Sequence, residues 1–400
     1  MLAGKHILVG VTGGIAAYKI PLLVRQLKQA GAEVKLIQTP ASLHFVSPLV
    51  LSTLSQNPVP HQLIASDGQT WENHVELALW ADVFLIAPAT ANTISKMANG
   101  LCDNLLMSVY LSAKCPVMLA PAMDLDMHKH PSFHRNIARL KQDGIIEIPA
   151  ETGFLASGLS GQGRMAEPET LFWQVVAQCS GEGKWKGKTI LINAGPTHEA
   201  IDPVRYIGNR STGKMGIALA QEAAMQGAEV HLVLGPSQEK IHHPNVNLYR
   251  IQTAEELLDQ CLELWTKADL AILSAAVADF KPKSAKHQKI KKTETQNLTI
   301  ELEENPDVLM QLSKNKQNHQ TLVGFALETQ NGLAYAQDKL KRKALDYIVL
   351  NTLSDKGAGF GFETNKITIV DKHNKITNFE LKSKANVAID ILNTIQCSPE

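Results

Sequence analysis

A net charge and a long apolar run are both missing from this sequence. The 39 Lys and Arg residues balance 39 Asp and Glu residues, so no global field attracts nucleic acid or an anionic membrane, and any basic function has to be local. No apolar run approaches the ~20 residues needed to cross a bilayer. The start, MLAGKHILVGV, runs into a glycine turn and lacks a cleavage-site pattern, which predicts a strand rather than a signal peptide.

Cysteines are few and unpaired in the sequence. The five of them are widely spaced, odd in number and without a C-x-x-C pair: Cys102, Cys115, Cys179, Cys261 and Cys397. This spacing argues against a disulfide framework or a zinc site, and it fits reduced thiols in the cytoplasm.

What the sequence does contain is a regular alternation of helix-length and strand-length apolar segments. Its length of 400 residues, with 44% hydrophobic and 20% charged residues, predicts a globular protein of two domains of roughly 200 residues. HILVGVT, a glycine turn, IAAYKIPLLVRQLKQA and AEVKLIQT are read as strand, turn, helix and strand. The alternation predicts a parallel sheet with helices on both faces.

The alternation starts again near residue 180. CSGEGKWKGK has the composition of a linker, TILINAG opens a second series, and Gly227 to Val230 repeats the sequence Gly-Ala-Glu-Val of Gly31 to Val34. We therefore predict two tandem α/β domains, residues 1–180 and 181–400. Each is a doubly wound, mainly parallel sheet of the Rossmann-like or flavodoxin-like kind.

The stretch from Ile201 to Gln221 is typical of a nucleotide site. It leaves a predicted strand, crosses a polar loop and opens a helix, and Gly213 and Gly216 leave room for a phosphate at the backbone. We expect Ser211 or Thr212 to cap this helix, whose first amides and dipole favour an anion. Ordinary turn and cap residues remain an alternative, although Asn209, Arg210, Ser211 and Lys214 crowd the same positions with polar groups.

In the first half, two strand ends indicate a mononucleotide rather than NAD. The GVTGGIAA turn lacks the G-x-G-x-x-G spacing, and Gln38-Thr39 stands where an NAD site needs an acidic residue. Thr39 could instead bind the phosphate of FMN. Thr90, Asn92 and Thr93 follow another strand and could contact a flavin, or they could simply cap a helix.

Three further segments of the first half are candidates for chemistry. His74 stands at the start of an amphipathic helix, where a lone histidine is often a surface or capping residue. The predicted loop PAMDLDMHKHP, residues 121–131, carries Asp124 but lacks recognisable metal-ligand spacing. GFLASGLSGQGRMAEP, residues 153–168, is read as a mobile flap or as an ordinary connection.

The second half supplies further candidates. Leu273, Ser274 and Ala275 end a strand with small residues, and Asp279 beyond them could bind a hydroxyl or Mg²⁺. Six lysines lie between 281 and 292; such a run is usually a solvated face, but one or two could serve a triphosphate. Residues 305–307 predict a helix start, Phe325 a strand end, and 339–343 a basic helical face before a terminal hairpin.

Taken together, these motifs resemble those of the bifunctional coenzyme A biosynthesis proteins of bacteria, in which phosphopantothenoylcysteine decarboxylase is fused to phosphopantothenate–cysteine ligase. Residues 1 to about 180 resemble the flavin-containing decarboxylases in GGIAAYK, the His74 helix, PATANTISKMA, PAM-x-x-x-M and the G-x-G-R-M flap. Residues from about 188 onward resemble the ligase in NAGPTHEAIDPVRYIGNRSTGKMG, SAAVADF, KIKK and ENPD. The resemblance covers almost the full length.

The resemblance implies that the second half ligates 4′-phosphopantothenate with L-cysteine, using CTP and Mg²⁺ and an acyl-cytidylate intermediate. Carried over by motif, Asn209 would hold the acyl-cytidylate, Lys289 would stabilise the charge that develops, and Asp279 would bind the Mg²⁺. The residues that would surround CTP are Leu273, Ser274, Ala275, Asp279, Lys289, Pro306, Asp307, Val308, Leu309, Phe325, Lys339 and Lys343.

For the first half, the resemblance implies FMN-dependent decarboxylation of phosphopantothenoylcysteine to 4′-phosphopantetheine. His74 would be the base, and Gly13, Thr39, Thr90 and Asn92 would contact FMN. The same resemblance implies a cytoplasmic homo-oligomer, a dodecamer built from trimeric flavin domains and dimeric ligase domains, with flavin sites between subunits.

Two residues depart from the family pattern. Asp124 replaces the usual asparagine of P-x-M-N, and Ser157 replaces the proton-donating cysteine of the flap. A carboxylate should repel the substrate's carboxylate unless it is protonated or turned aside, and a serine hydroxyl is a far weaker acid than a thiol. We expect decarboxylation to survive because the flavin supplies most of the driving force, with a proton relayed by Ser157 or water.

Other functions stay open at this point. The first half could be impaired in decarboxylation, or serve as a binding or regulatory module beside an active ligase. Taken alone, it could also be a flavin prenyltransferase or another oxidoreductase. The lysine run could contact nucleic acid, and a base read by backbone groups does not distinguish CTP from ATP.

Overall fold

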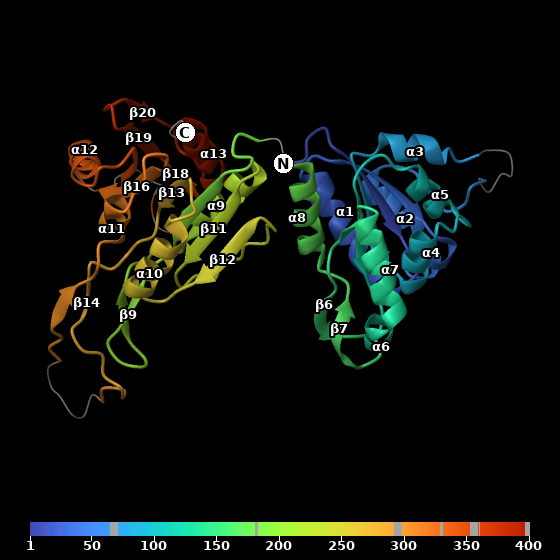
Figure 1. Cartoon of the computed structure of the whole chain (residues 1–400), viewed down its shortest axis with the longest axis horizontal. Helices are drawn as coiled ribbons and strands as arrows, with labels where there is room; N and C mark the ends of the chain where they lie inside the picture. Colours follow the sequence, from blue (N-terminus) through green and yellow to red (C-terminus); the bar gives the residue numbers. More distant parts are fainter. Residues whose placement is uncertain are drawn as a thin grey trace. The chain divides into compact units, whose positions relative to one another are not determined.

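The computed structural model describes residues 1–64, 71–180, 183–291, 298–328, 331–352, 359 and 361–396. The chain forms two compact units, Met1–Ser180 and Gly181–Glu400, each with its own sheet (Figure 1). Both units are α/β, as predicted from the alternation of apolar segments. Among the described residues, no helix has the length and apolar character needed to cross a bilayer.

The first unit is built on a five-stranded parallel sheet in the order β2-β1-β3-β4-β5. This is the flavodoxin-like strand order. The strands are β1 (His6–Val11), β2 (Glu33–Gln38), β3 (Val83–Ala89), β4 (Val117–Pro121) and β5 (Ile146–Glu147). A separate antiparallel hairpin joins β6 (Glu151–Phe154) to β7 (Ser160–Arg164).

Helices form two groups around this sheet. The first group is η1 (Ile15–Lys19), α1 (Ile20–Gln29), η2 (Pro40–His44), α2 (Pro48–Ser55) and α8 (Pro168–Cys179), in which α1 packs against α2 and α8. The second is α3 (His74–Trp80), α4 (Ala91–Asn99), α5 (Leu105–Ser112), α6 (Leu125–Lys129) and α7 (Pro131–Gln142), in which α3 packs on α5 and α4 on α7. Every residue of β3 is buried, as expected of a strand covered on both faces.

The second unit has an eight-stranded sheet in the order β12-β11-β8-β13-β16-β17-β19-β20. Six strands are parallel: β8 (Thr189–Ala194), β11 (Glu229–Leu234), β12 (Val246–Arg250), β13 (Leu270–Leu273), β16 (Thr321–Glu328) and β17 (Tyr347–Thr352). The antiparallel strands β19 (Ile367–Asp371) and β20 (Ile376–Asn378) confirm the predicted terminal hairpin.

Short strand pairs and five helices complete this unit. The pairs are β9 (His198–Ala200) with β10 (Tyr206–Gly208), β14 (Phe280–Pro282) with β15 (Leu302–Glu304), and β18 (Thr364–Asn365) with β21 (Lys382–Ser383). The described helices are α9 (Lys214–Met225), α10 (Ala254–Trp265), α11 (Val308–Lys314), α12 (Gly332–Arg342) and α13 (Lys384–Thr394).

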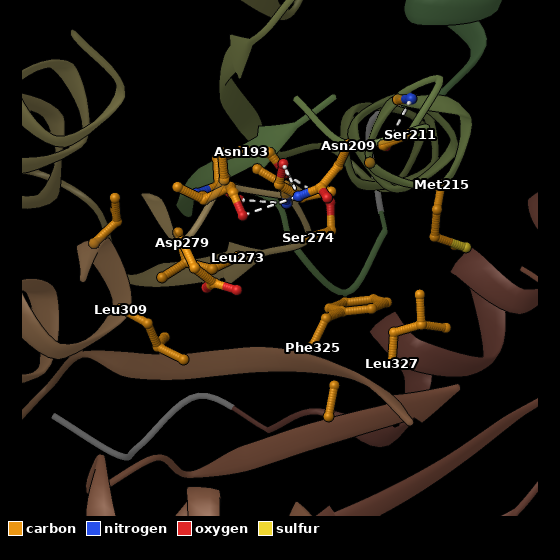
Figure 2. A pocket seen from close by; sticks show the side chains of 18 of the residues that line it. Asn193, Asn209, Ser211, Met215, Leu273, Ser274, Asp279, Leu309, Phe325 and Leu327 are labelled. Atoms are coloured by element: carbon orange, nitrogen blue, oxygen red, sulfur yellow. Dashed lines mark hydrogen bonds between the residues drawn. The ribbon is translucent and has the colours of Figure 1, made fainter. Parts of the chain in front are cut away.

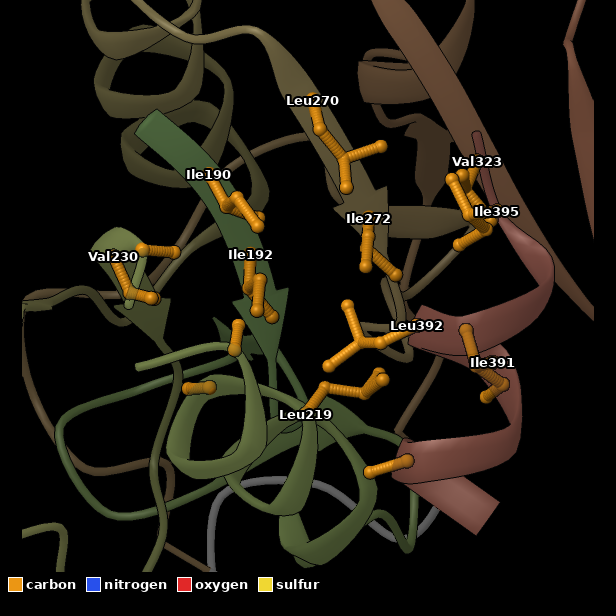
Figure 3. Close-up of a cluster of buried hydrophobic side chains, with 14 of the residues drawn as sticks. Ile190, Ile192, Leu219, Val230, Leu270, Ile272, Val323, Ile391, Leu392 and Ile395 are labelled. Carbon is orange, nitrogen blue, oxygen red and sulfur yellow. The ribbon is translucent and has the colours of Figure 1, made fainter. Parts of the chain in front are cut away.

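Helices α9 and α13 close one face of the second sheet. Figure 3 shows Leu219 of α9 and Leu392 of α13 meeting Ile192 and Ile272 from the central strands, all of them fully buried. A separate apolar cluster on α10, α11 and α12 packs against the same sheet. The C-terminal helix is therefore part of the core, and its first residue has a fixed position beside α9.

The repeated Gly-Ala-Glu-Val sequence marks the same turn in both units. Gly31 and Gly227 each follow a helix and lead into the next strand, β2 or β11, with φ of +91° and +92°. Residues that carry a side chain rarely adopt such positive φ angles, which explains why glycine stands at both positions.

Four details differ from the sequence-based expectations. The predicted linker is partly core, because Trp185 is 1% exposed within the second unit. The predicted loop 121–131 contains α6, and the predicted flap is the β6–β7 hairpin. Strand β16 continues past Phe325 to Glu328, because residues beyond Phe325 still pair with β17.

We expect Leu219→Ala to lower the free energy of unfolding of the second unit by about 2–5 kcal/mol, because it opens a cavity between α9 and the sheet. Urea unfolding followed by circular dichroism measures the change. Leu248→Ala on edge strand β12, where the side chain is 38% exposed, is the control. Equal losses for both variants would contradict this packing.

Candidate active sites

A cavity of about 770 Å³ lies at the carboxyl ends of the strands of the second sheet. After β8 the chain adds β11 and β12 on one side of it, and then β13, β16 and β17 on the other side. Such a switch point leaves a crevice between the strand ends, where ligands of α/β sheets bind. In Figure 2 Asp279 and Leu309 lie toward one end of this cavity and Met215 of α9 toward the other.

The start of α9 forms one wall of the cavity. Its N-cap is Gly213, with φ of +82° and no side-chain cap, so the predicted capping by Ser211 or Thr212 is wrong. Instead the Ser237 hydroxyl donates to the Thr212 carbonyl at 2.7 Å, which holds the chain before the helix. No side chain among the described residues caps α9, and Gly213 to Gly216 line the cavity with the start of the helix.

Gly216 brings α9 onto the strand ends. A Cβ at this position would lie 2.4 Å from the Ala194 Cβ and 2.6 Å from the Ser274 Oγ. Only a residue without a side chain allows this approach.

Three polar side chains fix the loop after β13 (Figure 2). The Ala275 N–H donates to Oδ1 of Asn193 at 2.9 Å, and the Ser274 hydroxyl donates to the Asn193 carbonyl at 2.6 Å. Nδ2 of Asn209 donates to the carbonyls of Ala276 and Val277, both at 3.0 Å. The backbone that lines this part of the pocket is thus held rigidly.

Positive charge enters the pocket from α12. Nζ of Lys339 donates to the Phe325 carbonyl at 2.8 Å, and burial, with Lys343 adding repulsion, lowers the pKa of Lys339. Lys343 forms an ion pair with Asp307 at 2.6 Å. Asp307 also caps α11 by accepting from the Met310 N–H at 3.0 Å.

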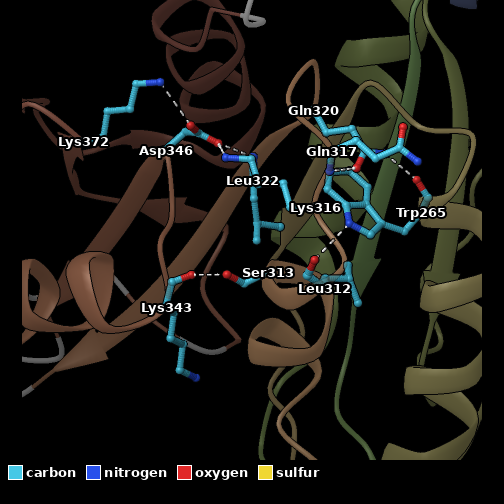
Figure 4. A network of polar contacts seen from close by, with 10 residues as sticks. All are labelled: Trp265, Leu312, Ser313, Lys316, Gln317, Gln320, Leu322, Lys343, Asp346 and Lys372. Atoms are coloured by element: carbon cyan, nitrogen blue, oxygen red, sulfur yellow. Dashed lines mark hydrogen bonds and ion pairs between the residues drawn. The ribbon is translucent and has the colours of Figure 1, made fainter.

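A polar network behind the pocket joins α11 to α12 (Figure 4). The Ser313 hydroxyl donates to the Lys343 carbonyl at 2.6 Å. Asp346, after α12, accepts from the Leu322 N–H at 2.8 Å and pairs with Lys316 and Lys372. Because the end of α12 is tied to both the sheet and α11, the lysines of α12 have defined positions.

The cavity collects the residues that the sequence predicts for the ligase, with one exception. Lys289 is exposed and does not line it. The predicted residues that line it are Asn209, Leu273, Ser274, Ala275, Asp279, Pro306, Asp307, Val308, Leu309, Phe325, Lys339 and Lys343.

Sequence reasoning missed several other lining residues. Asn193 and Asn351 are the last residue but one of β8 and of β17, Asn365 ends β18, and Lys384 begins α13. Oδ1 of Asn351 is buried and has no hydrogen-bond partner among the described residues. The positions of Asn193 and Asn351 near strand ends were an available signal; Lys384 has none, since only packing brings α13 to the pocket.

A second cavity, of about 1070 Å³, lies at the strand ends of the first unit. The loops after β1, β2, β3 and β4 line it, together with the β6–β7 hairpin. A Cβ on Gly13 would lie 2.6 Å from the Ala41 Cβ, so this loop stands directly against η2. The predicted flavin contacts Gly13, Thr39, Thr90 and Asn92 all line the cavity, as does Asp124.

Two threonine hydroxyls of this first pocket already take part in hydrogen bonds within the protein. Thr90 caps α4 by accepting from the Thr93 N–H at 3.4 Å. Thr39 donates to the Val11 carbonyl at 3.4 Å. Asp124 stands at the N-cap of α6 but makes no cap hydrogen bond, and its carboxylate has no partner among the residues that the structure describes.

A buried cation, Lys19, adds to this pocket and was not predicted. It is 4% exposed, and its Nζ donates to the Met165 carbonyl at 2.9 Å and to Glu167 at 3.1 Å. Burial, with Arg164 adding repulsion, lowers the pKa of Lys19 to about 8. Arg164 pairs with the same Glu167. Lys19 lies in η1 and Arg164 in β7, far apart in the sequence, so no local motif predicts that both pair with Glu167.

Two predicted catalytic residues lie outside the pocket as one chain forms it. His74 begins α3, its Nδ1 is buried without a partner among the described residues, and Trp71 contacts its ring edge-on at 5.5 Å. Ser157 is exposed at the tip of the β6–β7 hairpin. Neither lines the cavity, although Ala156 beside Ser157 does.

Comparisons with known proteins identify the family. Residues 1–180 match the family described as flavoprotein, and residues 185–397 match the DNA/pantothenate metabolism flavoprotein C-terminal domain. The coenzyme A biosynthesis bifunctional protein CoaBC of Bacillus subtilis (strain 168) is 42% identical over 397 residues, which are 99% of this chain and 97% of the relative.

The chain belongs to the bifunctional coenzyme A biosynthesis family.

The chain is also similar to a decarboxylase of another name and to a solved domain of a CoaBC protein. A cysteine/cysteine sulfinic acid decarboxylase of an unknown prokaryotic organism is 50% identical over 354 residues, 88% of this chain and 98% of the relative. The crystal structure of the C-terminal domain of a CoaBC protein is 38% identical, with a TM-score of 0.45; it covers 52% of this chain and 94% of that one. The resemblance stated from the motifs is thereby confirmed.

We expect Gly216→Ala to weaken binding of CTP, the nucleotide that the family resemblance implies, by 10-fold or more. The new Cβ would displace the first turn of α9 from the strand ends, and small misplacements of binding groups cost up to about 100-fold. The KM for CTP measures the change. The flavin content of the same variant is an internal control, because Gly216 belongs to the second unit; an unchanged KM would contradict the role of this close approach.

Proposed function

We propose that this protein carries out two successive steps of coenzyme A biosynthesis. The second unit ligates 4′-phosphopantothenate with L-cysteine at the expense of CTP, and the first unit decarboxylates phosphopantothenoylcysteine to 4′-phosphopantetheine with FMN. Relatives that match along nearly the whole chain support both activities. The single observation that carries the ligase half is the gathering of its predicted residues around one cavity.

In the ligase step, a carboxylate oxygen of phosphopantothenate attacks the α-phosphorus of CTP and pyrophosphate leaves. The cysteine amine then attacks the acyl carbon, and CMP leaves with the electrons of the broken bond. Both partners of the first attack are anions, so the site has to supply positive charge. Lys339 of α12 and Lys343, its C-cap residue, lie at the pocket, and their positive charges would attract these anions.

Mg²⁺ would be held by the carboxylate of Asp279 and by the phosphates of CTP. Asp279 lines the pocket, and no group of three acidic, histidine or cysteine side chains suited to a metal occurs among the described residues. Mg²⁺ commonly takes one or two protein carboxylates and completes its shell with substrate phosphates and water. A single aspartate therefore fits this kind of site.

Lys289 would serve a neighbouring subunit's pocket. It is exposed on the segment after β14 and lies outside the pocket of its own chain. A dimer of the second unit would reconcile that position with the role that the family resemblance implies.

The first pocket fits FMN. Gly13 and Gly14 line it beside the N-terminus of α4, which favours an anion such as a phosphate, and Thr39, Thr90 and Asn92 offer polar contacts. Bound FMN would supply reversible two-electron oxidation of the cysteinyl group. The chain's own part is to bind the substrate, exclude water and supply the proton that completes the product.

His74 would act as the base from a neighbouring subunit of a trimer. Its helix lies outside the pocket of its own chain, and its Nδ1 lacks a partner among the described residues. The exposed Trp71, Val75 and Leu79 around it would be covered by the neighbour. We further propose that the flavin units form trimers, and that dimers of the second unit join these trimers into a dodecamer. We also place the reaction in the cytoplasm, which the free thiols support.

A second candidate for the first unit is decarboxylation of free cysteine or of cysteine sulfinic acid. The 50% identity to a protein of that name favours it, and Asp124 makes the pocket differ from the usual family pattern. A flavin domain that only binds or regulates is not favoured, because these relatives are named as enzymes.

We expect purified protein with phosphopantothenate, L-cysteine, CTP and Mg²⁺ to release pyrophosphate, and to release far less with ATP. The charge and polar surface gathered at the second pocket suit a triphosphate, and the preference for CTP over ATP is what the family resemblance implies. Coupled detection of pyrophosphate measures the reaction. Lys339→Met should lower kcat/KM by roughly 10-fold or more, since hydrogen bonds to charged groups are worth about 1.5–3 kcal/mol. Absence of pyrophosphate with the intact protein would refute the ligase assignment.

We expect the FMN-loaded protein to release CO₂ from phosphopantothenoylcysteine and to form a thiol product. Asp124→Asn should lower the KM because it removes a repulsive carboxylate, and Ser157→Cys should raise kcat by about 10-fold because a thiol donates a proton more readily. CO₂ release and thiol formation are followed in parallel. Free cysteine and cysteine sulfinic acid are tested alongside; CO₂ from these alone would support the second candidate and contradict the first.

A further inference from the structure

One end of the second pocket is formed by residues that the predicted CTP contacts do not include. They come from the first turn of α9, from β18 and from the start of α13: Met215, Asn365 and Lys384. Lys384 is the first residue of α13 and is only 8% exposed. It belongs to none of the motifs found in the sequence.

The position of Lys384 is fixed by its backbone. Its N–H donates to the Glu363 carbonyl at 3.0 Å, and Ser383 before it pairs with Thr364 of β18. Beyond it, α13 packs against α9 and the sheet through Ile391 and Leu392 (Figure 3). The ammonium group is therefore brought to the pocket by the fold, without help from a carboxylate.

The charge of Lys384 is poorly matched within the described part of the chain. Its Nζ donates to the Gly359 carbonyl at 3.4 Å, and it forms no ion pair with a described residue. An ammonium has three donors, so two are left for a ligand. Burial, followed by repulsion from Lys214, lowers the pKa of Lys384. Lys214 itself is neutralised by Glu363 and by Glu239 at 3.6 Å.

The first turn of α9 adds donors at the same end. Its N-cap is Gly213, which has no side chain to occupy the first amides, and Gly213 to Gly216 line the cavity together with Lys384. Helix amides and a buried ammonium favour the same kind of ligand, a multiply charged anion. The carboxylate of Asp279 lies toward the other end of the cavity (Figure 2).

We propose that Lys384 and the first amides of α9 bind a phosphoryl group of a ligase substrate. This inference rests on the proposed ligase function. The phosphoryl group has two possible sources, the triphosphate of CTP and the 4′-phosphate of phosphopantothenate. Binding would bring a counter-charge to Lys384, because the nearby carboxylates Glu239 and Glu363 both pair with Lys214.

The test compares Lys384→Met with Lys382→Met in the full chain. Methionine keeps the length and packing of a buried lysine stem but removes its charge. Lys382 lies two residues earlier, forms an ion pair with Asp390 at 2.8 Å and does not line the pocket. We expect Lys384→Met to raise one KM by roughly 10- to 100-fold, Lys384→Arg to restore part of the affinity, and Lys382→Met to match the unchanged protein.

The substrate whose KM rises identifies the source of the phosphoryl group. A higher KM for CTP points to the triphosphate, and a higher KM for phosphopantothenate points to its 4′-phosphate. Unchanged KM values for both substrates would overturn the inference. Circular dichroism and the melting temperature of the free proteins show whether Lys384→Met is folded.

A binding measurement separates this inference from the ligase assignment. Inorganic pyrophosphate should raise the melting temperature of the unchanged protein and of Lys382→Met, and should raise that of Lys384→Met much less. This comparison does not require turnover, so it tests Lys384 even if the protein makes no pyrophosphate from CTP. Equal shifts in all three proteins would count against the site.

Discussion

Close approach of backbone to backbone at the strand ends is the constraint on which both sites depend. In the second unit, Gly216 lets the first turn of α9 rest on Ala194 and Ser274, and the Asn193 side chain then holds the loop after β13. In the first unit, Gly13 stands against Ala41 in the same way. A side chain at either glycine would occupy the space that lets helix starts and strand ends converge. The polar groups around each cavity are useful because this backbone frame is rigid.

Much of this arrangement could be predicted because parallel sheets place the carboxyl ends of their strands at one edge. The alternation of helices and strands places residues at the ends of parallel strands along one edge of each sheet. Thr39 and Thr90 accordingly line the first cavity, and Leu273 lines the second. The glycines at residues 31 and 227 were signalled by a repeated sequence and have matching backbone angles. The cap of α9 was mispredicted because a glycine in a left-handed conformation replaced the expected side-chain cap.

Residues supplied by distant elements could not be predicted from local patterns. Lys19 meets Arg164 of β7 only because the hairpin folds back over the first pocket, and Lys384 reaches the second pocket because α13 packs on α9. Neither lysine is part of a spacing that indicates chemistry by itself. His74, Ser157 and Lys289 were assigned through family resemblance, and they lie outside the cavity of a single chain. A sequence motif identifies such residues without saying where the fold places them relative to a pocket.

The two pockets differ in how their charges are matched, and this difference suits their proposed ligands. In the first, Glu167 pairs with both the buried Lys19 and Arg164. The carboxylate of Asp124 has no partner among the described residues. In the second, Asp307 pairs with Lys343, whereas the hydrogen bonds that Lys339 and Lys384 donate within the described ranges go to backbone carbonyls. Burying an ammonium without a counter-ion is costly, and a ligand that supplies negative charge recovers that cost on binding. The second pocket therefore suits ligands with several negative charges, while in the first the two cations share one carboxylate partner, Glu167.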